Sequence, residues 1–399
     1  MKRILAIIAS LSISIIMCAC AGSADPKKGG GENNSGADEP VSDKSIGSSS
    51  GKTVGIALPS EDILRWKNDG TYLKQQFETA GFNVELRYSE NDDSRQNADI
   101  DEMISGKVDL LLVAAVDGST LSQTLDKAVS SDIPVIAYDR LITDTDAVSF
   151  FVSFDDYAVG RLQGEFVRDR LQLDSSSGPF NIEFIAGDPT EQSARRVFDG
   201  AFDALKPYFD EGKLVIPSDR SSFEKVAEPY WSTDSALNDM KEALDSCYSD
   251  GTILDAALCS NDSLALGAVQ AIGSEYSGSN KPIVTGQGGD IENLRNIVDG
   301  TQTMTVYKNP TDEAHAAFEI CKAVLSGQTP DGVFVDSLSV KADYDTDSYD
   351  NNKKKVPSCL VSPSVINKDN LQLLVDTGLY EWDSENKYLL STEKKQQNG

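Results

Sequence analysis

Two adjacent residues of opposite charge, Asp139 and Arg140, directly follow an apolar run that is typical of a strand (IPVIAY, 133–138). A carboxylate accepts hydrogen bonds from two hydroxyl groups, and a guanidinium group donates several from a planar fork. A ligand with many hydroxyl groups needs both kinds of partner. The pair is therefore a candidate clamp for a small polyhydroxylated molecule, and the alternative is an ordinary surface ion pair at the end of a strand.

Other polar residues follow strand-like runs in the same way. They are Arg65, Trp66, Asp117, Gln192, Arg195, Asn261, Asp262 and Lys308. Arg65 with Trp66 offers directional donors beside a flat apolar face, which suits the hydroxyl edge and C–H face of a sugar. Asp117 and Asp262 are alternatively helix caps, because Asp is common at that position. Trp231 is a second candidate stacking face, or else a core or hinge residue.

The order of elements indicates how these residues are positioned. From residue 52 to about 300, short apolar runs alternate with helical patterns, as in TVGIAL followed by 63–80 and VDLLLVAA followed by 119–130. Such alternation predicts an α/β fold with doubly wound parallel sheets covered by helices on both faces. Ligands of such sheets bind beyond the carboxyl ends of the strands. The candidate residues follow the strands and are expected there.

The N-terminus has the features of an export signal. Lys2 and Arg3 precede an apolar run, and small residues follow it, so we expect a signal peptide at 1–19. Cys20 follows Ala19 as in a lipoprotein signal, and we expect it to be lipidated; an unlipidated secreted form is the alternative. Residues 20–51 are expected to form a disordered tether, because they carry almost no large apolar side chain. The protein is then extracytoplasmic, on the outer face of the cell membrane or in the periplasm, and only its lipid touches the membrane.

Composition argues against several functions. The net charge is −28 and no basic patch is visible, so nucleic acid is not an expected partner. Catalytic motifs such as G-x-S-x-G and H-E-x-x-H are absent from the sequence, and we expect no enzyme activity and no cofactor. We also expect no metal, since Ser348 and Lys354 break the calcium-loop pattern that Asp343 begins. Of four scattered cysteines, Cys259, Cys321 and Cys359 lie in apolar stretches and are expected to be buried free thiols, although disulfides are chemically allowed outside the cytoplasm.

Eight stretches of the chain carry a resemblance to periplasmic sugar-binding proteins of the ribose/xylose class, in particular to the xylose-binding and multiple-monosaccharide-binding proteins of ABC importers. They are LRWKNDG (64–70), VIAYDRLI (135–142), FVSFDDYAVGRLQ (151–163), GPFNIEFIAGDP (178–189), LKPYFDEGKLV (205–215), CSNDSLALGAVQAI (259–272), GTQTMTVYK (300–308) and VPSCLVSPSVINKDN (356–370). The resemblance implies two lobes, a three-stranded hinge and one monosaccharide between the lobes. It implies that an ABC permease receives the sugar and that the protein is a monomer; the alternative is a sensing component that docks on a membrane sensor or chemoreceptor.

The resemblance also implies boundaries and contacts. The N-terminal lobe is expected at 52–153 plus 306–357, the C-terminal lobe at 154–305 plus 358–382, and a flexible tail at 383–399. Sugar contacts carried over from the family are Arg65, Trp66, Asp139, Arg140, Asn261 and Lys308.

Two departures from the family pattern bear on the ligand. Gly288 stands where the family has a sugar-binding aspartate, and Asp290 either compensates for it or caps the next helix. Gln192 and Ser193 replace two asparagines, and Arg195 stands where ribose-type relatives have an arginine. We hypothesise a changed ligand, with an extra substituent beside Gly288.

Overall fold

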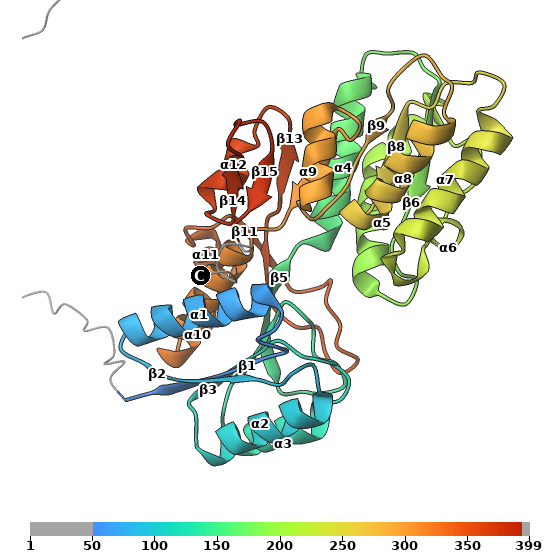
Figure 1. Cartoon of the computed structure of the whole chain (residues 1–399). Coiled ribbons are helices and arrows are strands. Elements are labelled where there is room, and N and C mark those ends of the chain that lie inside the picture. Colours follow the sequence, from blue (N-terminus) through green and yellow to red (C-terminus); the bar gives the residue numbers. More distant parts are fainter. Residues whose placement is uncertain (1–50, 393–399) are drawn as a thin grey trace, which may run out of the picture. The chain divides into compact units, whose positions relative to one another are not determined.

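The computed structural model describes residues 51–392, in which strands and helices alternate along most of the chain (Figure 1). The expected signal peptide at 1–19, the lipidation site Cys20 and the tether up to residue 50 lie outside the described residues. No helix between residues 51 and 392 is long and apolar enough to cross a membrane.

A seven-stranded sheet has the order β11-β12-β5-β4-β3-β1-β2. Its strands are β1 (Thr53–Leu58), β2 (Asn83–Tyr88), β3 (Leu110–Val113), β4 (Val135–Tyr138), β5 (Val148–Phe154), β11 (Ala342–Asp345) and β12 (Ser358–Val361). All neighbouring strands are parallel except β11, which is antiparallel to β12.

Helices cover both faces of this sheet (Figure 1). They are α1 (Leu64–Thr79), α10 (Pro310–Leu325) and the short α11 (Gly332–Asp336) on one face, with α2 (Asp93–Ser105) and α3 (Ser122–Ser130) on the other. Alternate residues of a strand point to opposite faces. Leu110 and Leu112 accordingly pack with α1 and α10, whereas Leu111 packs with α2 and α3. Because both faces are covered, the central strands β3 and β4 are apolar throughout, whereas the edge strands β2 and β11 carry charged residues.

A four-stranded parallel sheet has the order β7-β6-β8-β9. Its strands are β6 (Phe180–Ile185), β7 (Leu214–Val215), β8 (Ala256–Cys259) and β9 (Ile283–Val284). The accompanying helices are α4 (Asp156–Leu171), α5 (Gln192–Asp210), α6 (Phe223–Val226), the 3₁₀ turn η1 (Pro229–Trp231), α7 (Thr233–Cys247), α8 (Asp262–Glu275) and α9 (Ile291–Asp299). Helices α4 and α5 pack closely because Gly160 has no side chain; a Cβ there would lie 1.7 Å from the carbonyl oxygen of Val197.

Two antiparallel pairs complete the described chain. Strand β10 (Met304–Tyr307) pairs with β13 (Ser364–Asn367), and β14 (Tyr380–Trp382) pairs with β15 (Leu389–Ser391), with α12 (Gln372–Asp376) between the two pairs in sequence. Leu371, Leu374 and Leu389 pack against Leu294 and Ile297 of α9 in one apolar cluster. Part of the tail expected to be flexible is therefore an ordered strand, because Leu389 is buried in this cluster.

The predicted fold class, α/β with parallel sheets covered by helices, is confirmed. Strand pairing bears on the expected lobe boundaries at two points. Strand β12, expected in the C-terminal lobe, pairs with β5 in the seven-stranded sheet, and β10 pairs outside that sheet. If each sheet belongs to one lobe, the chain would pass between the lobes for the third time after β12. Cys259, Cys321 and Cys359 are buried thiols as predicted, whereas Cys247 is half-buried.

Candidate functional site

Arg65, in the first turn of α1, lies among three carboxyl groups. Its Nη2 atom is 2.7 Å from Oδ1 of Asp139 and 2.5 Å from Oε2 of Glu313. Its Nε atom is 3.5 Å from Oδ2 of Asp69. We call these four residues the Arg65 cluster. One guanidinium group cannot neutralise three carboxylates, so the cluster is negatively charged unless at least two of its acids are protonated.

Burial decides which acids hold protons. Glu313 is fully buried and Asp69 is 3% exposed. Burial raises the pKa of Asp69 to about 6 and raises that of Glu313 well above its usual range, because water no longer stabilises the charged forms. Oε1 of Glu313 is buried without a hydrogen-bond partner among residues 51–392. A neutral Glu313 fits this environment.

Asp139 and Arg140 do not pair with each other. Asp139 contacts Arg65, whereas Nη1 of Arg140 donates to the carbonyl oxygens of Ala115 (3.0 Å) and Val116 (3.2 Å), just after β3. Asp139 has a φ of 61°, which is uncommon for a side-chain-bearing residue and turns the chain sharply after β4. The surface ion pair considered from the sequence is thus absent, and both side chains lie at the carboxyl ends of neighbouring strands.

Trp66 supports both guanidinium groups. The Cζ atoms of Arg65 and Arg140 lie 4.7 Å and 5.6 Å from its ring centroid, and Tyr138 packs against it edge-on at 6.4 Å. Such contacts are favourable because the ring face carries negative charge density. Trp66 is only 3% exposed, so little of the indole is open to a ligand in this conformation.

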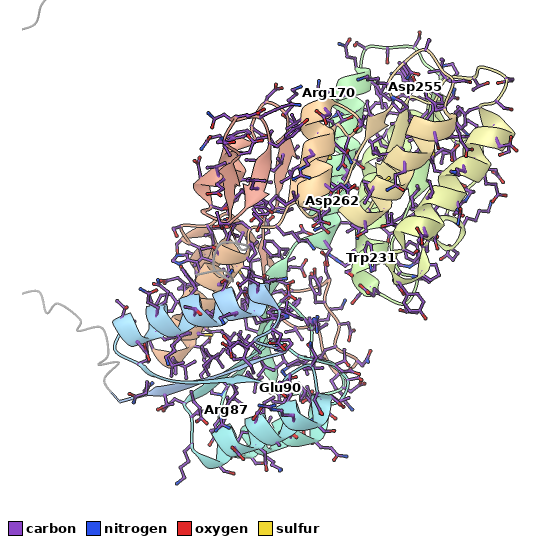
Figure 2. All side chains as sticks on the ribbon, viewed as in Figure 1. Arg87, Glu90, Arg170, Trp231, Asp255 and Asp262 are labelled. Atoms are coloured by element: carbon purple, nitrogen blue, oxygen red, sulfur yellow. The ribbon has the colours of Figure 1, made fainter. Side chains whose placement is uncertain are left out.

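Asp262 is fully engaged in the protein. Asp262 is labelled in Figure 2. It is 1% exposed, and its Oδ2 accepts hydrogen bonds from the backbone N–H groups of Gly289 (2.7 Å) and Asp290 (3.0 Å). Its Oδ1 accepts from Thr305 Oγ1 (2.9 Å) and Gln302 Nε2 (3.1 Å). Burial raises its pKa to about 6 despite these donors. Asp262 is therefore neither the helix cap nor an open ligand contact; it anchors the loop at 288–290.

Asn261 is the residue that caps α8, since its Oδ1 accepts from the N–H of Leu264 at 2.9 Å. Lys308 follows β10, and its Nζ is 2.5 Å from Oδ1 of Asp156 and 5.8 Å from the ring centroid of Phe154. Both residues follow strands, as the sequence analysis expects.

The remaining candidates have other local partners. Gln192 is exposed at the start of α5, and Arg195 pairs with Glu224 while its Cζ lies 4.4 Å from the ring centroid of Phe223. Oδ1 of Asp117 accepts from Ser119 N–H and Oγ, and these hydrogen bonds lower the pKa of the Asp117 carboxyl.

Trp231 (Figure 2) packs over Gly187, where a Cβ would lie 2.1 Å from the indole. It also packs against the apolar clusters of the four-stranded sheet, which fits the core interpretation weighed from the sequence.

A cavity of about 410 Å³ joins some of these residues. Arg65, Phe154 and Lys308 line it on one side, together with the loop from Gln287 to Asp290. Phe154 and two members of the Arg65 cluster, Asp69 and Glu313, were not predicted from the sequence. Asp69 follows Arg65 by four residues, a helical spacing that could have revealed it. Glu313 gave no such signal, because it lies 248 residues away in sequence.

Between residues 51 and 392, no group of three or more His, Cys, Asp or Glu side chains is arranged to hold a metal ion.

The chain is similar to several known proteins. A family model described as "Periplasmic binding protein domain" matches residues 54–329. The multiple sugar-binding periplasmic receptor ChvE of Rhizobium radiobacter is 36% identical over 335 residues, which are 83% of this chain and 91% of that protein. The D-xylose-binding periplasmic protein of Escherichia coli K12 is 32% identical over 332 residues, which are 83% of this chain and 92% of that protein.

A solved structure is also similar. An ABC transporter solute binding protein from Clostridium phytofermentans with bound β-D-glucose is 42% identical and superposes with a TM-score of 0.66. The match covers 84% of this chain and 99% of that one.

Proposed function

Because this chain belongs to the periplasmic binding protein family, we propose that it captures a monosaccharide outside the cytoplasm and delivers it to an ABC importer. The relatives named for xylose and for multiple sugars, and the glucose-bound structure, support this class of ligand. The candidate sugars are xylose, glucose, galactose and ribose. We infer no catalysis, since the relatives are named as binding proteins and receptors.

One observation carries this proposal. Asp139 contacts Arg65, Arg140 donates to two backbone carbonyl groups, and both guanidinium groups lie over the ring of Trp66. Asp139 has an acceptor oxygen to which a sugar hydroxyl can donate. Arg140 uses its Nη1 for two backbone carbonyl groups, and its other guanidinium N–H groups can donate to a sugar. Arg65, which contacts Asp139, is one-third exposed and lines the cavity. Hydroxyl groups entering there would exchange hydrogen bonds with ionised partners, which are stronger than neutral hydrogen bonds.

We further propose that binding is coupled to closure of two lobes. One lobe would hold the seven-stranded sheet, and the other the four-stranded sheet. Asn261 belongs to the second, and Lys308 follows a strand outside both sheets. A sugar that contacts both lobes favours the closed form by its difference in affinity for the two forms. The permease would then recognise the closed form of a monomer.

Anchoring by a lipid on Cys20 belongs to the same proposal, and it would keep the binding protein near its importer. Labelling with a fatty-acid analogue tests it: wild-type chain should be labelled and Cys20→Ser should not. Label retained by Cys20→Ser would contradict the anchor.

A second candidate is a sensing role, which the word "receptor" in the name of the Rhizobium radiobacter relative favours. The same closed form would dock on a membrane sensor instead of a permease. Co-purification from membranes with the sugar present separates the two candidates, because a permease and a histidine kinase or chemoreceptor are distinguishable by mass.

A thermal-shift screen with pentoses and hexoses tests sugar binding. A ligand that binds only the native state stabilises it by about 2.7 kcal/mol at a hundred times its Kd. Arg140→Ala and Asp139→Asn should weaken the best sugar by about tenfold or more, since each removes hydrogen bonds to a charged group. Asparagine is chosen because it tolerates the positive φ at 139.

Matched controls are Arg161→Ala and Asp210→Asn, in exposed i,i+4 ion pairs on α4 and α5. They should leave the shift unchanged. If the site variants retain the full shift, the assigned site is wrong, and if no sugar shifts the wild-type chain, the proposed function is wrong.

A further inference from the structure

The loop from Gly286 to Asp290 has a backbone path that requires glycine. Gly288 and Gly289 have φ values of 147° and 90°, which side-chain-bearing residues rarely adopt. A Cβ at Gly288 would lie 3.2 Å from Oδ2 of Asp262, and one at Gly289 would lie 3.0 Å from the hydroxyl of Tyr380. The backbone is fixed because Asp262 binds the next two N–H groups and Gly288 N–H donates to Val306 O at 3.0 Å. A side chain at position 288 would therefore be strained in this backbone conformation and crowded against Asp262.

Asp290 is the first residue after these glycines whose side chain can reach a ligand. It stands at the N-cap position of α9, yet its side chain makes no capping hydrogen bond. Its backbone N–H donates to Asp262, and the residue lines the cavity. Partial burial raises its pKa. The structure thus keeps an acceptor group at the cavity wall that does not cap α9.

The wall beside Asp290 comes from the C-terminal hairpin β14–β15. The hydroxyl of Tyr380 donates to Gly289 O at 3.0 Å, and its ring packs edge-on against Tyr307 with centroids 5.9 Å apart. Leu379 and Ser391 also line the cavity there. The hairpin therefore extends the cavity beyond Arg65 and Lys308 with the side chains of Tyr380 and Ser391, next to Leu379 just before β14, while Tyr307 belongs to β10 and is 6% exposed.

This combination has the chemistry of a carbohydrate subsite. Tyrosine rings offer flat apolar faces with polar edges, and Asp290 offers two acceptor oxygens for hydroxyl groups. The cavity volume of about 410 Å³ lies within the range of pockets that hold ligands of drug-like size.

We propose that the space between Asp290 and the hairpin is a second saccharide subsite, so that a disaccharide binds more tightly than the monosaccharide that occupies the first subsite alone. The inference rests on the proposed monosaccharide binding and extends the ligand by one sugar unit. One sugar unit would contact the Arg65 cluster, and the linked unit would contact Asp290, Tyr307 and Tyr380.

Calorimetry on the full-length chain tests the subsite with matched ligands: glucose against cellobiose and maltose, and xylose against xylobiose. At least one disaccharide should bind about tenfold tighter than its own monosaccharide, as expected for one or more added hydrogen bonds to a charged group. Asp290→Asn should remove about tenfold of the disaccharide affinity and change monosaccharide affinity by less than about twofold.

Glu292→Gln is the matched control, because it removes the same charge from an exposed residue two positions along that does not line the cavity. Its affinities should equal those of the wild type. Leu379→Trp supplies an independent variant: the larger side chain should block the disaccharide and spare the monosaccharide. Melting temperatures of all variants verify folding.

The outcomes separate the two proposals. Monosaccharide binding without any disaccharide binding overturns the subsite alone, as does an equal loss of both ligands in Asp290→Asn. Failure of every saccharide to bind overturns the proposed function and the subsite with it.

Discussion

Two buried acidic residues, Asp69 and Asp262, have similar pKa values of about 6 but opposite surroundings. Asp262 accepts four hydrogen bonds from neutral donors, and each of its oxygens is used. Asp69 shares the single cation Arg65 with two other acids, and polar atoms of that cluster stay unpaired within the described chain. A satisfied carboxylate holds a loop in place, whereas the Arg65 cluster sets one cation among three acids and contains buried polar atoms that the described chain does not pair.

The Arg65 cluster should be broken most severely by Arg65→Ala. Removing the cation leaves Asp139 and two buried acids without a counter-charge, and we expect a loss of about 2–4 kcal/mol in the free energy of unfolding at pH 7, after allowance for the exposed part of Arg65. Sugar affinity should fall by at least about a hundredfold. Urea unfolding and calorimetry measure the two effects, with Arg161→Ala as control. Sugar affinity equal to that of the wild type would show that the cluster is structural only.

Asp262→Asn should mainly affect stability. The amide keeps one acceptor oxygen, but its NH₂ group then faces backbone N–H groups of the loop, which are donors too. We therefore expect a loss of about 2–3 kcal/mol in the free energy of unfolding. Monosaccharide affinity should fall less than in Arg65→Ala, because the Asp262 side chain is covered. If Asp262→Asn weakens binding as much as Arg65→Ala at equal folded fraction, the distinction between the two regions is lost.

The pH dependence of stability sharpens the same comparison. Burial raises the pKa of both Asp69 and Asp262 from 3.8 to about 6, so the native state holds more protons than the unfolded chain between these values. Their contribution to the free energy of unfolding is therefore largest below pH 3.8 and declines as pH rises through about 6. Asp69→Asn should remove its share of this decline, on the order of 1–3 kcal/mol.

Unfolding curves for wild type and Asp69→Asn at several pH values give that difference directly. Asp210→Asn, in an exposed ion pair, should leave the slope unchanged. A difference curve for Asp69→Asn that is flat across the window would mean that Asp69 is charged in the native state as readily as in the unfolded chain.

The smallest effect is expected at the loop that Asp262 holds. Gly288→Ala should cost about 1–2 kcal/mol of stability, because alanine at a φ of 147° is strained. Gly273→Ala on α8 has open space for its methyl group and should instead stabilise by about 0.5–1 kcal/mol, as is usual for glycine replaced within a helix. Chemical denaturation of both variants checks the opposite signs. A neutral Gly288→Ala would show that the loop adopts another backbone path.

The sequence indicated much of the candidate site because its signals are local. Asp139 and Arg140 follow a strand, and Arg65 with Trp66 begins a helix. In a parallel sheet, residues at these positions lie together at the carboxyl ends of the strands. The sequence did not separate Asn261 from Asp262, since either residue type can cap a helix. Only their contacts make Asn261 the cap and Asp262 the anchor of a distant loop.

The hairpin β14–β15 shows the limit of composition. The stretch after residue 383 is polar, and the sequence analysis expected a flexible tail. Leu389 nevertheless joins an apolar cluster with α9 and α12, and Leu390 pairs with Glu381 across the hairpin. One or two apolar residues in a polar stretch give no periodic pattern, so pairing with another segment was not visible.

The alternation of apolar runs and helical patterns by itself determined the α/β architecture. Parallel strands need helices between them, and these helices bury both faces of the sheet. The alternation also determined which residues end the strands. The tertiary structure alone decided which charges meet: Arg65 and Glu313 are 248 residues apart in sequence and 2.5 Å apart in space. Electrostatic interactions depend on distance and burial, and neither is encoded in the spacing of residues along the chain.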